Sequence, residues 1–467
     1  MPVFTRRASV PVSAERLFAW HDHRGAFERL VPPWQTVRLA RFDGIRNGQR
    51  AVLKLGPGPT PLTWVAEHHD FIPDRQFRDV QVRGPFARWE HTHRMLPKGP
   101  DASTLEDHVD YRLPLAPVSE WLGGGTAQKQ LDRMFAYRHR VTREDLRRHA
   151  LYDLDQKTVA ITGSTGLLGE ALVAFLTTGG HRVVRLVRSR AAVARYAHRE
   201  DERAAYWDAA RGEIDAEALE GVDAVVHLAG ESVYGLRWTD DKKRRILESR
   251  VQGTRLLSET LARLDAPPAA LLSASGSNYY GDREDERLTE ETASGDGFLA
   301  DVCRRWEAAT APAAEAGIRV VTLRLGPVLT PAGGILGTLL PAFHLGLGAT
   351  VGRGDTYVPW IALDDVLYAV LHLLATPEVR GPVNVGAPEP VTQRTFVETV
   401  GHVLRRPTFV RVPPSVVRAV GGEQAGELAL TSLRLIPAAL ANSGFSFAYP
   451  HLEPALRHLL GKMPPAA

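Results

Sequence analysis

Three regularly spaced glycines could support nucleotide chemistry. Gly163, Gly166 and Gly169 form Gly-x-x-Gly-x-x-Gly directly after the apolar run TVAIT and directly before a helical pattern. Glycines there permit a tight turn and close backbone approach to a pyrophosphate, and a helix N-terminus stabilises its charge. The alternative is a purely structural strand-to-helix turn. We expect the whole loop to contact a dinucleotide: Gly163, Ser164, Thr165, Gly166, Leu167, Leu168 and Gly169.

The end of the next predicted strand indicates which dinucleotide binds. An acid there would hydrogen-bond the ribose 2′-hydroxyl of NAD, whereas arginine accommodates the 2′-phosphate of NADP. The run VVRLVRSR places Arg188, Ser189 and Arg190 at this point, with no acid. We therefore predict NADP(H) rather than NAD, with Arg188 and Ser189 as contacts. The alternative is that these arginines are solvated surface charges.

The elements that position this loop begin after a change of pattern near residue 150. From TVAIT onward, buried apolar strands alternate with helices, and DAVVHLAG, AALLSAS and RVVTLRLG continue the series. Such near-continuous apolar strands indicate a parallel sheet with helices on both faces, a doubly wound α/β Rossmann fold. We therefore place a first domain at 1–148, a linker at 149–156 and the nucleotide-binding domain at 157–467.

The sequence predicts an α+β fold for the first domain. Ser13 is a plausible helix N-cap, a second short helix stops at Pro32, and alternating runs such as QFRDVQVRG and FARWEHTHRML follow. A long helix is expected from residue 127 to 149. This order of elements resembles the START-like (SRPBCC) helix-grip fold, which implies an apolar cavity for a hydrophobic small molecule. Trp64, Phe86 and Trp89 would line the core or that cavity.

Composition and charge limit the classes of binding partner that are expected. The formal net charge is +3, from 57 basic and 54 acidic residues, and no long run of one sign occurs. We therefore expect neither nucleic-acid binding nor a membrane span, since the most apolar stretch, 334–352, is broken by Pro341 and several glycines. A single cysteine, Cys303, excludes an internal disulfide. With no secretory signal at the start, we expect a cytoplasmic protein. The oligomeric state is not predicted.

Five motifs in order carry a family resemblance: TGSTGLLG, VVHLAGES, ESRVQGTRLLSETLA, SASGSNYYGD and RLGPVLTP. They resemble an extended short-chain dehydrogenase/reductase of the nucleotide-sugar epimerase type. GDGFLADVCRRWEAA and the closing region resemble, more narrowly, its atypical NAD-dependent epimerase-family branch, labelled cell-division-inhibitor-like. Some members of this branch carry a START-like domain. The resemblance implies a small C-terminal subdomain, about 405–460, on the substrate side of the cofactor cleft.

The resemblance also assigns site residues. It implies Leu228, Ala229 and Gly230 as cofactor neighbours, together with Val328, and puts Arg250 where an asparagine is usual. The catalytic serine corresponds to Ser275, with Ser273 as the alternative. Tyr280 corresponds to a tyrosine that is ordinarily structural, although it or Tyr279 could supply a phenol. Arg250 is expected to hold ribose or phosphate, or else to be a helix-surface charge.

The Tyr-x-x-x-Lys pair of these enzymes is absent. Its lysine lowers the pKa of the tyrosine that exchanges a proton with substrate. The residues four positions before every lysine include no tyrosine: Arg50, Arg94, Gly125, Asp153, Trp238, Thr239 and His458. Aligning the acid after this motif on Glu307 puts Leu299 and Cys303 in the two places. Cys303 is either a small buried hydrophobe or a catalytic thiol near the nicotinamide, ionised by Arg250 and acting as proton donor or nucleophile.

Metal binding is not expected. His91 and His93 alternate onto one face of a strand, but no third ligand stands at convincing spacing, even with His68 or His69. We expect an NADP(H)-dependent oxidoreductase or epimerase-like enzyme with non-standard acid–base groups, acting on an unknown, possibly apolar substrate. The alternatives are an NADPH-sensing regulatory protein without turnover and a lipid-binding protein in which the reductase-like part is scaffold.

Overall fold

The computed structural model describes residues 2–56, 60–114, 118–196, 201–235 and 237–463, with the backbone alone over 118–124. The chain divides into two compact units, 1–155 with 174–180 and 458–467, and 156–173 with 181–457. Within the described ranges, every helix is too short or too polar to cross a membrane. Each unit is described separately below.

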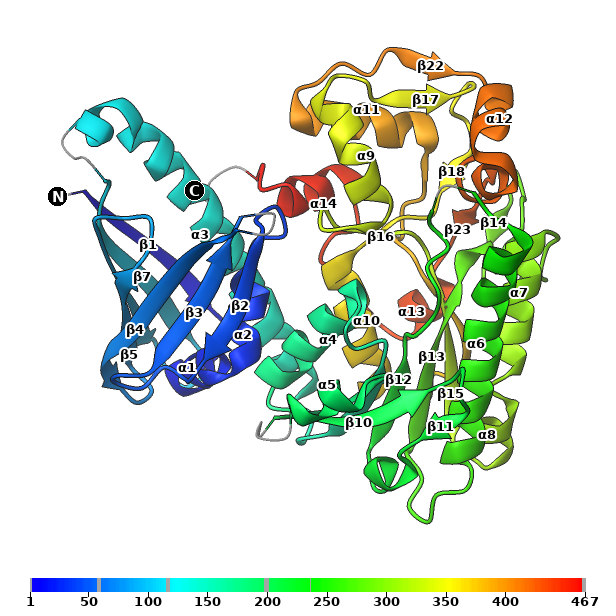
Figure 1. The fold of residues 1–467 in the computed structure, drawn as a ribbon, viewed down its shortest axis with the longest axis horizontal. Coiled ribbons are helices and arrows are strands. Elements are labelled where there is room, and N and C mark those ends of the chain that lie inside the picture. Colours follow the sequence, from blue (N-terminus) through cyan, green and yellow to red (C-terminus); the bar gives the residue numbers. More distant parts are fainter. Residues whose placement is uncertain (1, 57–59, 115–117, 197–200, 236, 464–467) are drawn as a thin grey trace. The chain divides into compact units, whose positions relative to one another are not determined.

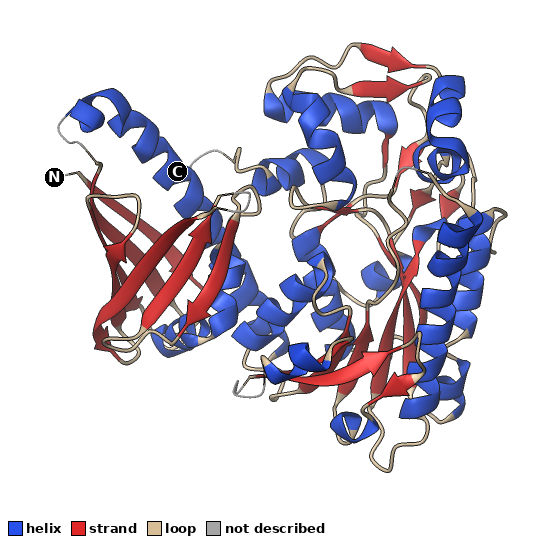
Figure 2. Ribbon diagram, in the orientation of Figure 1, coloured by secondary structure: helices blue, strands red, loops and turns tan. Residues whose placement is uncertain are grey.

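The first unit is a curved antiparallel sheet with a long helix against it (Figure 2). Its strand order is β1-β7-β6-β5-β4-β3-β2. The elements are β1 (Val3–Val10), α1 (Ala14–Asp22), α2 (Arg24–Leu30), β2 (Val37–Phe42), β3 (Arg50–Leu55), β4 (Leu62–Ile72), β5 (Gln76–Arg83), β6 (Arg88–Pro97), β7 (Ser103–Arg112) and α3 (Val118–Tyr152).

Local sequence explains these elements. Ser13 caps α1 by accepting a hydrogen bond from the Arg16 amide. Alternate residues of β6 and β7 turn inward, and the β6 and β7 side chains of Trp89, Val109 and Tyr111 share one core with Phe135 of α3. This confirms the predicted helix-grip order.

Helix α3 differs from its predicted extent in two ways. It begins at Val118 rather than 127, although it contains the glycines 123–125, which disfavour helix. It also runs to Tyr152, so the first half of the predicted linker, 149–152, is helical. The compact units divide between Asp155 and Gln156. The proposed domain limits, 1–148 and 157–467, remain a prediction.

The second unit is built on a sheet of order β11-β10-β9-β8-β12-β13-β15-β20, parallel except for β11 (Figure 1). This order reverses direction between β8 and β12, as in doubly wound nucleotide-binding folds. The sheet and its helices are β8 (Thr158–Thr162), α4 (Leu167–Thr178), β9 (Arg182–Val187), α5 (Arg190–Ala194), β10 (Glu202–Asp208), β11 (Glu213–Ile214), β12 (Ala224–His227), α6 (Asp240–Leu261), β13 (Ala270–Gly276), α7 (Phe298–Ala308), α8 (Ala311–Glu315), β15 (Arg319–Leu325), α10 (Leu363–Ala375) and β20 (Gly381–Val385).

The C-terminal portion forms short strand pairs and helices beyond this sheet. They are β14 (Arg287–Leu288), β16 (Val328–Leu329), α9 (Gly334–His344), β17 (Ala349–Val351), β18 (Tyr357–Val358), β19 (Ile361–Ala362), β21 (Val391–Thr392), α11 (Gln393–Leu404), β22 (Val410–Val412), α12 (Pro414–Ala425), β23 (Arg434–Leu435), α13 (Ala438–Asn442) and α14 (Leu452–Leu459). Because β22 pairs with β17, the predicted subdomain 405–460 also draws on chain before residue 405. The stretch 334–352, for which a loop and a helix are expected, contains helix α9 and the short strand β17.

Candidate functional site

The site lies where the sheet order reverses, at the carboxyl ends of β8 and β12. Thr162 ends β8 and His227 ends β12, and the Oγ1 and Nδ1 atoms of these residues are 2.7 Å apart. His227 Nε2 lies 2.9 Å from Oγ1 of Thr254 on α6. Burial, together with the charge of Arg250, lowers the pKa of His227 to about 4. A neutral imidazole therefore joins two strands and a helix beneath the glycine loop.

The glycine loop fits a pyrophosphate. Gly163 has φ of +66°, and a Cβ on it would lie 2.9 Å from the backbone of Leu228 and Ala229. A Cβ on Gly169 would lie 2.2 Å from the Gly163 carbonyl oxygen. The Gly166 amide closes the turn on Gly163, which leaves amides of the first turn of α4 for an anion. The Ser164 hydroxyl is buried with no hydrogen-bond partner among the described residues.

The end of β9 carries the predicted selectivity residues. Arg188 is exposed, and no hydrogen bond or ion pair of its guanidinium occurs within the described part of the chain. Ser189 caps α5, since its Oγ accepts from the Ala192 amide at 3.3 Å. The Arg190 guanidinium lies 4.3 Å from the Tyr206 ring centre. Arg188 is therefore the arginine left free for a phosphate.

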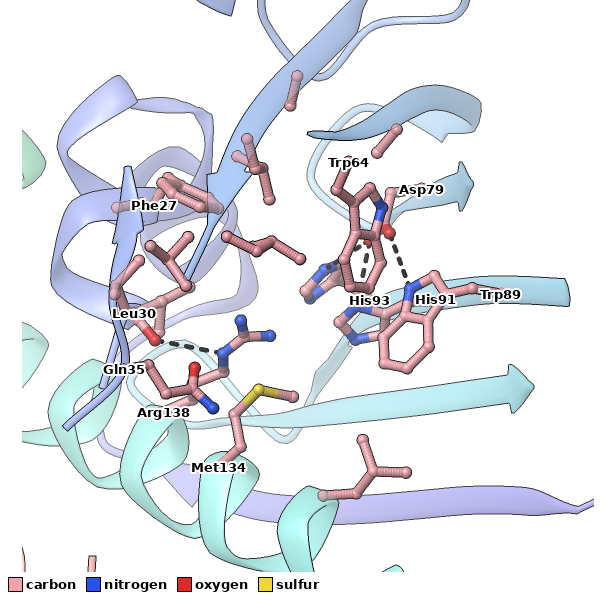
Figure 3. Close-up of a pocket in the computed structure, with 18 of the residues that line it drawn as sticks. Phe27, Leu30, Gln35, Trp64, Asp79, Trp89, His91, His93, Met134 and Arg138 are labelled. Atoms are coloured by element: carbon pink, nitrogen blue, oxygen red, sulfur yellow. Dashed lines mark hydrogen bonds and ion pairs between the residues drawn. The ribbon is translucent and has the colours of Figure 1, made fainter. Parts of the chain in front are cut away.

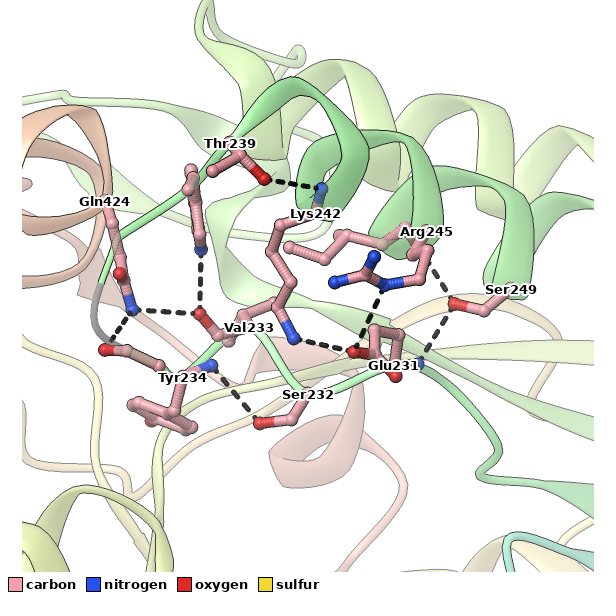
Figure 4. Close-up of polar contacts among 12 residues, drawn as sticks. Glu231, Ser232, Val233, Tyr234, Thr239, Lys242, Arg245, Ser249 and Gln424 are labelled. Atoms are coloured by element: carbon pink, nitrogen blue, oxygen red, sulfur yellow. Dashed lines mark hydrogen bonds and ion pairs between the residues drawn. The ribbon is translucent and has the colours of Figure 1, made fainter.

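A polar cluster follows β12 (Figure 4). Lys242 Nζ donates to Glu231 at 2.7 Å, and the Glu231 amide donates to Ser249. The Lys242 bond, assisted by the charges of Arg245 and Arg188, lowers the pKa of Glu231. Gln424 of α12 donates to the carbonyl of Val233, so the C-terminal portion fixes this loop.

The remaining predicted cofactor neighbours border the same loop. Leu228 and Ala229 are half-buried and Gly230 is exposed. Arg250 Nη1 donates to the carbonyls of Glu231 and Ile246, so this atom holds the loop rather than standing free. Val328 begins the segment that leads to Gly333, and a Cβ on Gly333 would lie 2.9 Å from the side chain of Leu167 in the glycine loop.

Ser275 is itself buried and belongs to a buried charge network. Ser275 Oγ donates to Glu307 Oε1 at 2.7 Å. Arg324 of β15 donates to both Glu307 oxygens, at 2.9 and 3.0 Å. The alternative serine, Ser273, is buried and its hydroxyl reaches only the neighbouring Ala274 carbonyl, at 3.5 Å. Ser275 is thus the serine of this strand joined to a charged group.

Tyr280 belongs to the same network and is fully buried. Its hydroxyl donates to Asn384 at 2.6 Å and accepts from Arg324 at 2.9 Å. Burial outweighs the effect of Arg324 and raises the pKa of Tyr280 to about 12. Tyr279 lies under Arg324, whose Cζ is 3.5 Å from its ring centre. These bonds give Tyr280 a structural role in the network, and its use as a proton donor stays a prediction.

Leu299 and Cys303 are both buried on α7, next to β13. A Cβ on Gly276 would lie 3.3 Å from the Cys303 Sγ. Burial raises the pKa of the thiol to about 11, despite the charge of Arg250. Burial thus opposes ionisation of the thiol by Arg250 and favours Cys303 as a small apolar side chain at neutral pH, and a catalytic role for it stays a prediction.

Arg324 was missed by the sequence analysis. Its signal was a lone charge inside the apolar strand RVVTLRL, which requires a buried partner. The pairing with Glu307 depends on how α7 packs on the sheet, which the sequence alone does not give.

A second candidate site is a cavity of about 590 Å³ inside the first unit (Figure 3). Trp64, Phe86 and Trp89 line it, as predicted. Arg138 of α3 also faces it and donates to the Leu30 carbonyl at 3.2 Å. Its walls are mainly apolar and its size suits a drug-sized molecule.

One wall of the cavity carries ionisable groups. His91 of β6 is buried between Asp79 and Asp107, whose charges outweigh its burial and raise its pKa to about 9. Asp79 was missed as the third potential ligand beside His91 and His93: three such atoms lie within 4.8 Å of one another. The register that pairs Asp79 with His91 is a contact between strands. His68 and His69 do not join this set.

Three family assignments cover nearly the whole chain. Residues 159–386 match the NAD dependent epimerase/dehydratase family, residues 412–459 match a domain of unknown function, DUF1731, and residues 10–135 match a polyketide cyclase/dehydrase and lipid transport family. The last match agrees with the START-like expectation for the first domain.

Relatives agree with these assignments. An epimerase family protein of Mycobacterium bovis is 42% identical over 298 residues, which are 64% of this chain and 96% of that protein. A solved structure described as the nucleoside-diphosphate sugar epimerase from Corynebacterium glutamicum shares 34% identity and a TM-score of 0.80, covering 99% of this chain and 91% of that one. Human epimerase family protein SDR39U1, solved with NADPH, shares 31% identity and a TM-score of 0.58 over 66% of this chain and all of its own. The chain belongs to the NAD-dependent epimerase/dehydratase family of short-chain dehydrogenase/reductase-like proteins.

Proposed function

We propose that the second unit is an NADP(H)-dependent oxidoreductase or epimerase-like enzyme with a non-standard acid–base site. The preference for NADP(H) over NAD rests on the exposed Arg188 at the end of β9, which has no acidic residue beside it. The NADPH in the solved human relative supports this choice.

Ser275 is the group that we propose meets the substrate. Its proton already points to Glu307, so its oxygen lone pairs can accept a hydrogen bond from a substrate hydroxyl. NADP(H), when bound, supplies or takes the hydride. In the oxidising direction, the substrate hydroxyl proton passes to Ser275 Oγ as the serine proton passes to Glu307. Glu307 then replaces the missing tyrosine and lysine as the proton store.

An NADPH-sensing protein without turnover is the second candidate. The observation that favours it is that Tyr280 and Cys303 are buried in their neutral forms, with pKa values of about 12 and about 11. Ser275 alone is a weak acid at neutral pH. Oxidation of NADPH in a substrate screen separates the enzyme from the sensor, because both bind the cofactor.

The first unit is proposed to hold an apolar small molecule. The aromatic walls around Trp64 and Trp89 supply the apolar surface, and the Arg138 guanidinium at the cavity suits an anionic head on such a molecule. Whether it is the substrate of the second unit is tested by co-purification followed by NADPH turnover.

Calorimetric titration tests the cofactor proposal. NADPH should bind more tightly than NADH, and Arg188→Ala should reduce the difference without weakening NADH. Arg182→Ala is the matched control, because Arg182 is an exposed arginine at the opposite end of β9. Equal affinities for the two cofactors in the unchanged protein would exclude the proposed role of Arg188.

A further inference from the structure

Ionisable side chains in one wall of the cavity of the first unit form two layers. Asp79, His91 and His93 line the cavity, whereas Asp107 and His139 lie behind them, outside its lining. The register of the sheet sets this arrangement: Asp79 of β5 stands opposite His91 of β6, and His93 stands opposite Asp107 of β7. The cluster is thus built by three neighbouring strands and closed by His139 from α3.

Both imidazoles lie between the same two carboxylates. His91 Nδ1 and His93 Nε2 face Asp79 Oδ1, at 3.1 and 3.6 Å. The other nitrogens, His91 Nε2 and His93 Nδ1, each lie 2.8 Å from Asp107 Oδ1. The two ring centres are only 3.8 Å apart.

Hydrogen bonds alone do not satisfy all four contacts between the two imidazoles and the two carboxylates. A neutral imidazole has one N–H, so each ring can donate to one carboxylate and must turn a bare nitrogen to the other. A protonated His91 can donate to both carboxylates, but a neutral His93 still turns a bare nitrogen to one of them, and protonating both rings would put two cations 3.8 Å apart in a buried site. A single metal ion between Asp79 Oδ1 and the two nitrogens that face it would be bound by all three atoms.

We propose that Asp79 Oδ1, His91 Nδ1 and His93 Nε2 bind one divalent first-row transition ion, of which Zn²⁺ is the probe, at the wall of the cavity. Ligands bound at about 2.1 Å stand roughly 3.0–3.4 Å apart around such an ion. The separations of 3.1 and 3.6 Å from Asp79 require little movement. Two histidines and one carboxylate are a known ligand set with open positions.

The surrounding groups complete the site. With the ion on the Asp79 side, His91 Nε2 is hydrogen-bonded to Asp107 Oδ1, His93 Nδ1 lies 2.8 Å from the same oxygen, and the second oxygen of Asp107 pairs with His139 Nε2. The second oxygen of Asp79 accepts from Trp89 Nε1 at 3.2 Å. Carboxylates behind ligating histidines fix their tautomer and increase their basicity. Asp79, His91 and His93 all line the cavity (Figure 3), so an apolar ligand with an oxygen donor could reach an ion that they hold.

Metal titration of the full-length, tag-free chain tests this site. After treatment with a chelator, we expect one Zn²⁺ per chain by mass spectrometry and competition with a chromophoric chelator, and visible d–d absorption with Co²⁺. Asp79→Asn, nearly isosteric, should weaken binding by more than the roughly 10- to 100-fold expected of Asp107→Asn. His108→Gln is the control, because His108 pairs with Thr5 outside the cluster and should leave binding unchanged.

A measurement on the unchanged protein covers the case in which the variants do not fold. Bound Zn²⁺ should protect His91 and His93 from diethyl pyrocarbonate and leave the half-buried His69 as reactive as before. The proposed site would be overturned if the unchanged protein bound Zn²⁺ no more tightly than Asp79→Asn, or if Zn²⁺ did not protect the two histidines. The group would then be a charge-balanced histidine–aspartate cluster. NADPH affinity is read from the second unit, so failure here does not affect the proposed function.

Discussion

Ser275 and Glu307 are joined by a 2.7 Å hydrogen bond that ties the end of β13 to the last turn of α7. Because Arg324 holds both oxygens of Glu307, the carboxylate stays in place and sets the direction of the serine proton. The serine proton is therefore taken by Glu307, which leaves the serine oxygen as an acceptor. This differs from a tyrosine–lysine pair, which presents a donor.

Removal of the serine hydroxyl tests this assignment. Ser275→Ala should lower the turnover number in a responsive NADPH-oxidation assay by roughly 10²- to 10⁴-fold, the range of a positioned proton-transfer group. Ser275→Thr should retain most of the rate, since it keeps the hydroxyl. NADPH affinity should be unchanged in both. A fully active Ser275→Ala protein would remove this serine from the proton path.

Gly169→Ala tests the close approach in the loop. Its Cβ would lie 2.2 Å from the Gly163 carbonyl oxygen, a rigid backbone atom, so the loop must move. We expect NADPH affinity to fall below detection in calorimetry and the unfolding temperature to drop. Gly426→Ala is the control, because a Cβ there meets no atom within 4 Å. Equal NADPH affinity in both variants would contradict the predicted role of the loop.

Tyr280→Phe separates a structural from a catalytic phenol. Loss of the hydroxyl leaves Arg324 Nη1 and the Asn384 oxygen without this partner, which should lower the free energy of unfolding by about 1–3 kcal/mol. Turnover per folded molecule should not change. Tyr279→Phe, on the neighbouring tyrosine, should affect neither quantity. Normal stability with lost turnover would restore Tyr280 as a proton donor.

Alkylation measures the state of Cys303. Because burial raises the pKa of its thiol to about 11, the thiolate is scarce at pH 8 and the sulfur is covered. We expect iodoacetamide to leave the folded protein unmodified for hours and to add one label after denaturation, read by intact mass. Labelling of the folded protein within minutes at pH 8 would show an activated thiol.

Local patterns predicted what depends on neighbours in sequence. The glycine loop needs only residues 163–169, and the missing dyad follows from the position of each lysine. The placement of His91 and His93 on one face of their strand follows from their alternation. Each of these predictions uses a spacing of a few residues, which the helix or strand period converts directly into geometry.

Contacts between elements that are far apart in the sequence could not be predicted from such local spacings. Asp79 meets His91 through the β5–β6 register, and Glu307 meets Arg324 through packing of α7 on the sheet. Both acids were visible in the sequence, but their partners lie 12 and 17 positions away. The sequence also could not show that burial keeps Cys303 neutral, since a pKa depends on surroundings in three dimensions.

His227 should make the nucleotide-binding unit sensitive to acid. The reason is that burial disfavours its charged form and lowers its pKa to about 4 in the folded protein, against 6.5 when exposed. The unfolded chain therefore binds a proton first, so stability is complete above pH 6.5 and falls as the pH drops toward 4. The loss should reach about 3 kcal/mol at most.

Hydrogen exchange of peptides covering β8 and β12 measures this effect locally. Protection in the unchanged protein should fall between pH 6.5 and 4, after correction for intrinsic exchange. His227→Gln lacks the titrating group, so its protection should vary less over this range, although its value at pH 7 is lower because the bonds to Thr162 and Thr254 are altered. The other acids of the unit titrate in both proteins and cancel in the comparison. Parallel pH profiles would therefore show that His227 is not the group whose protonation opens the sheet.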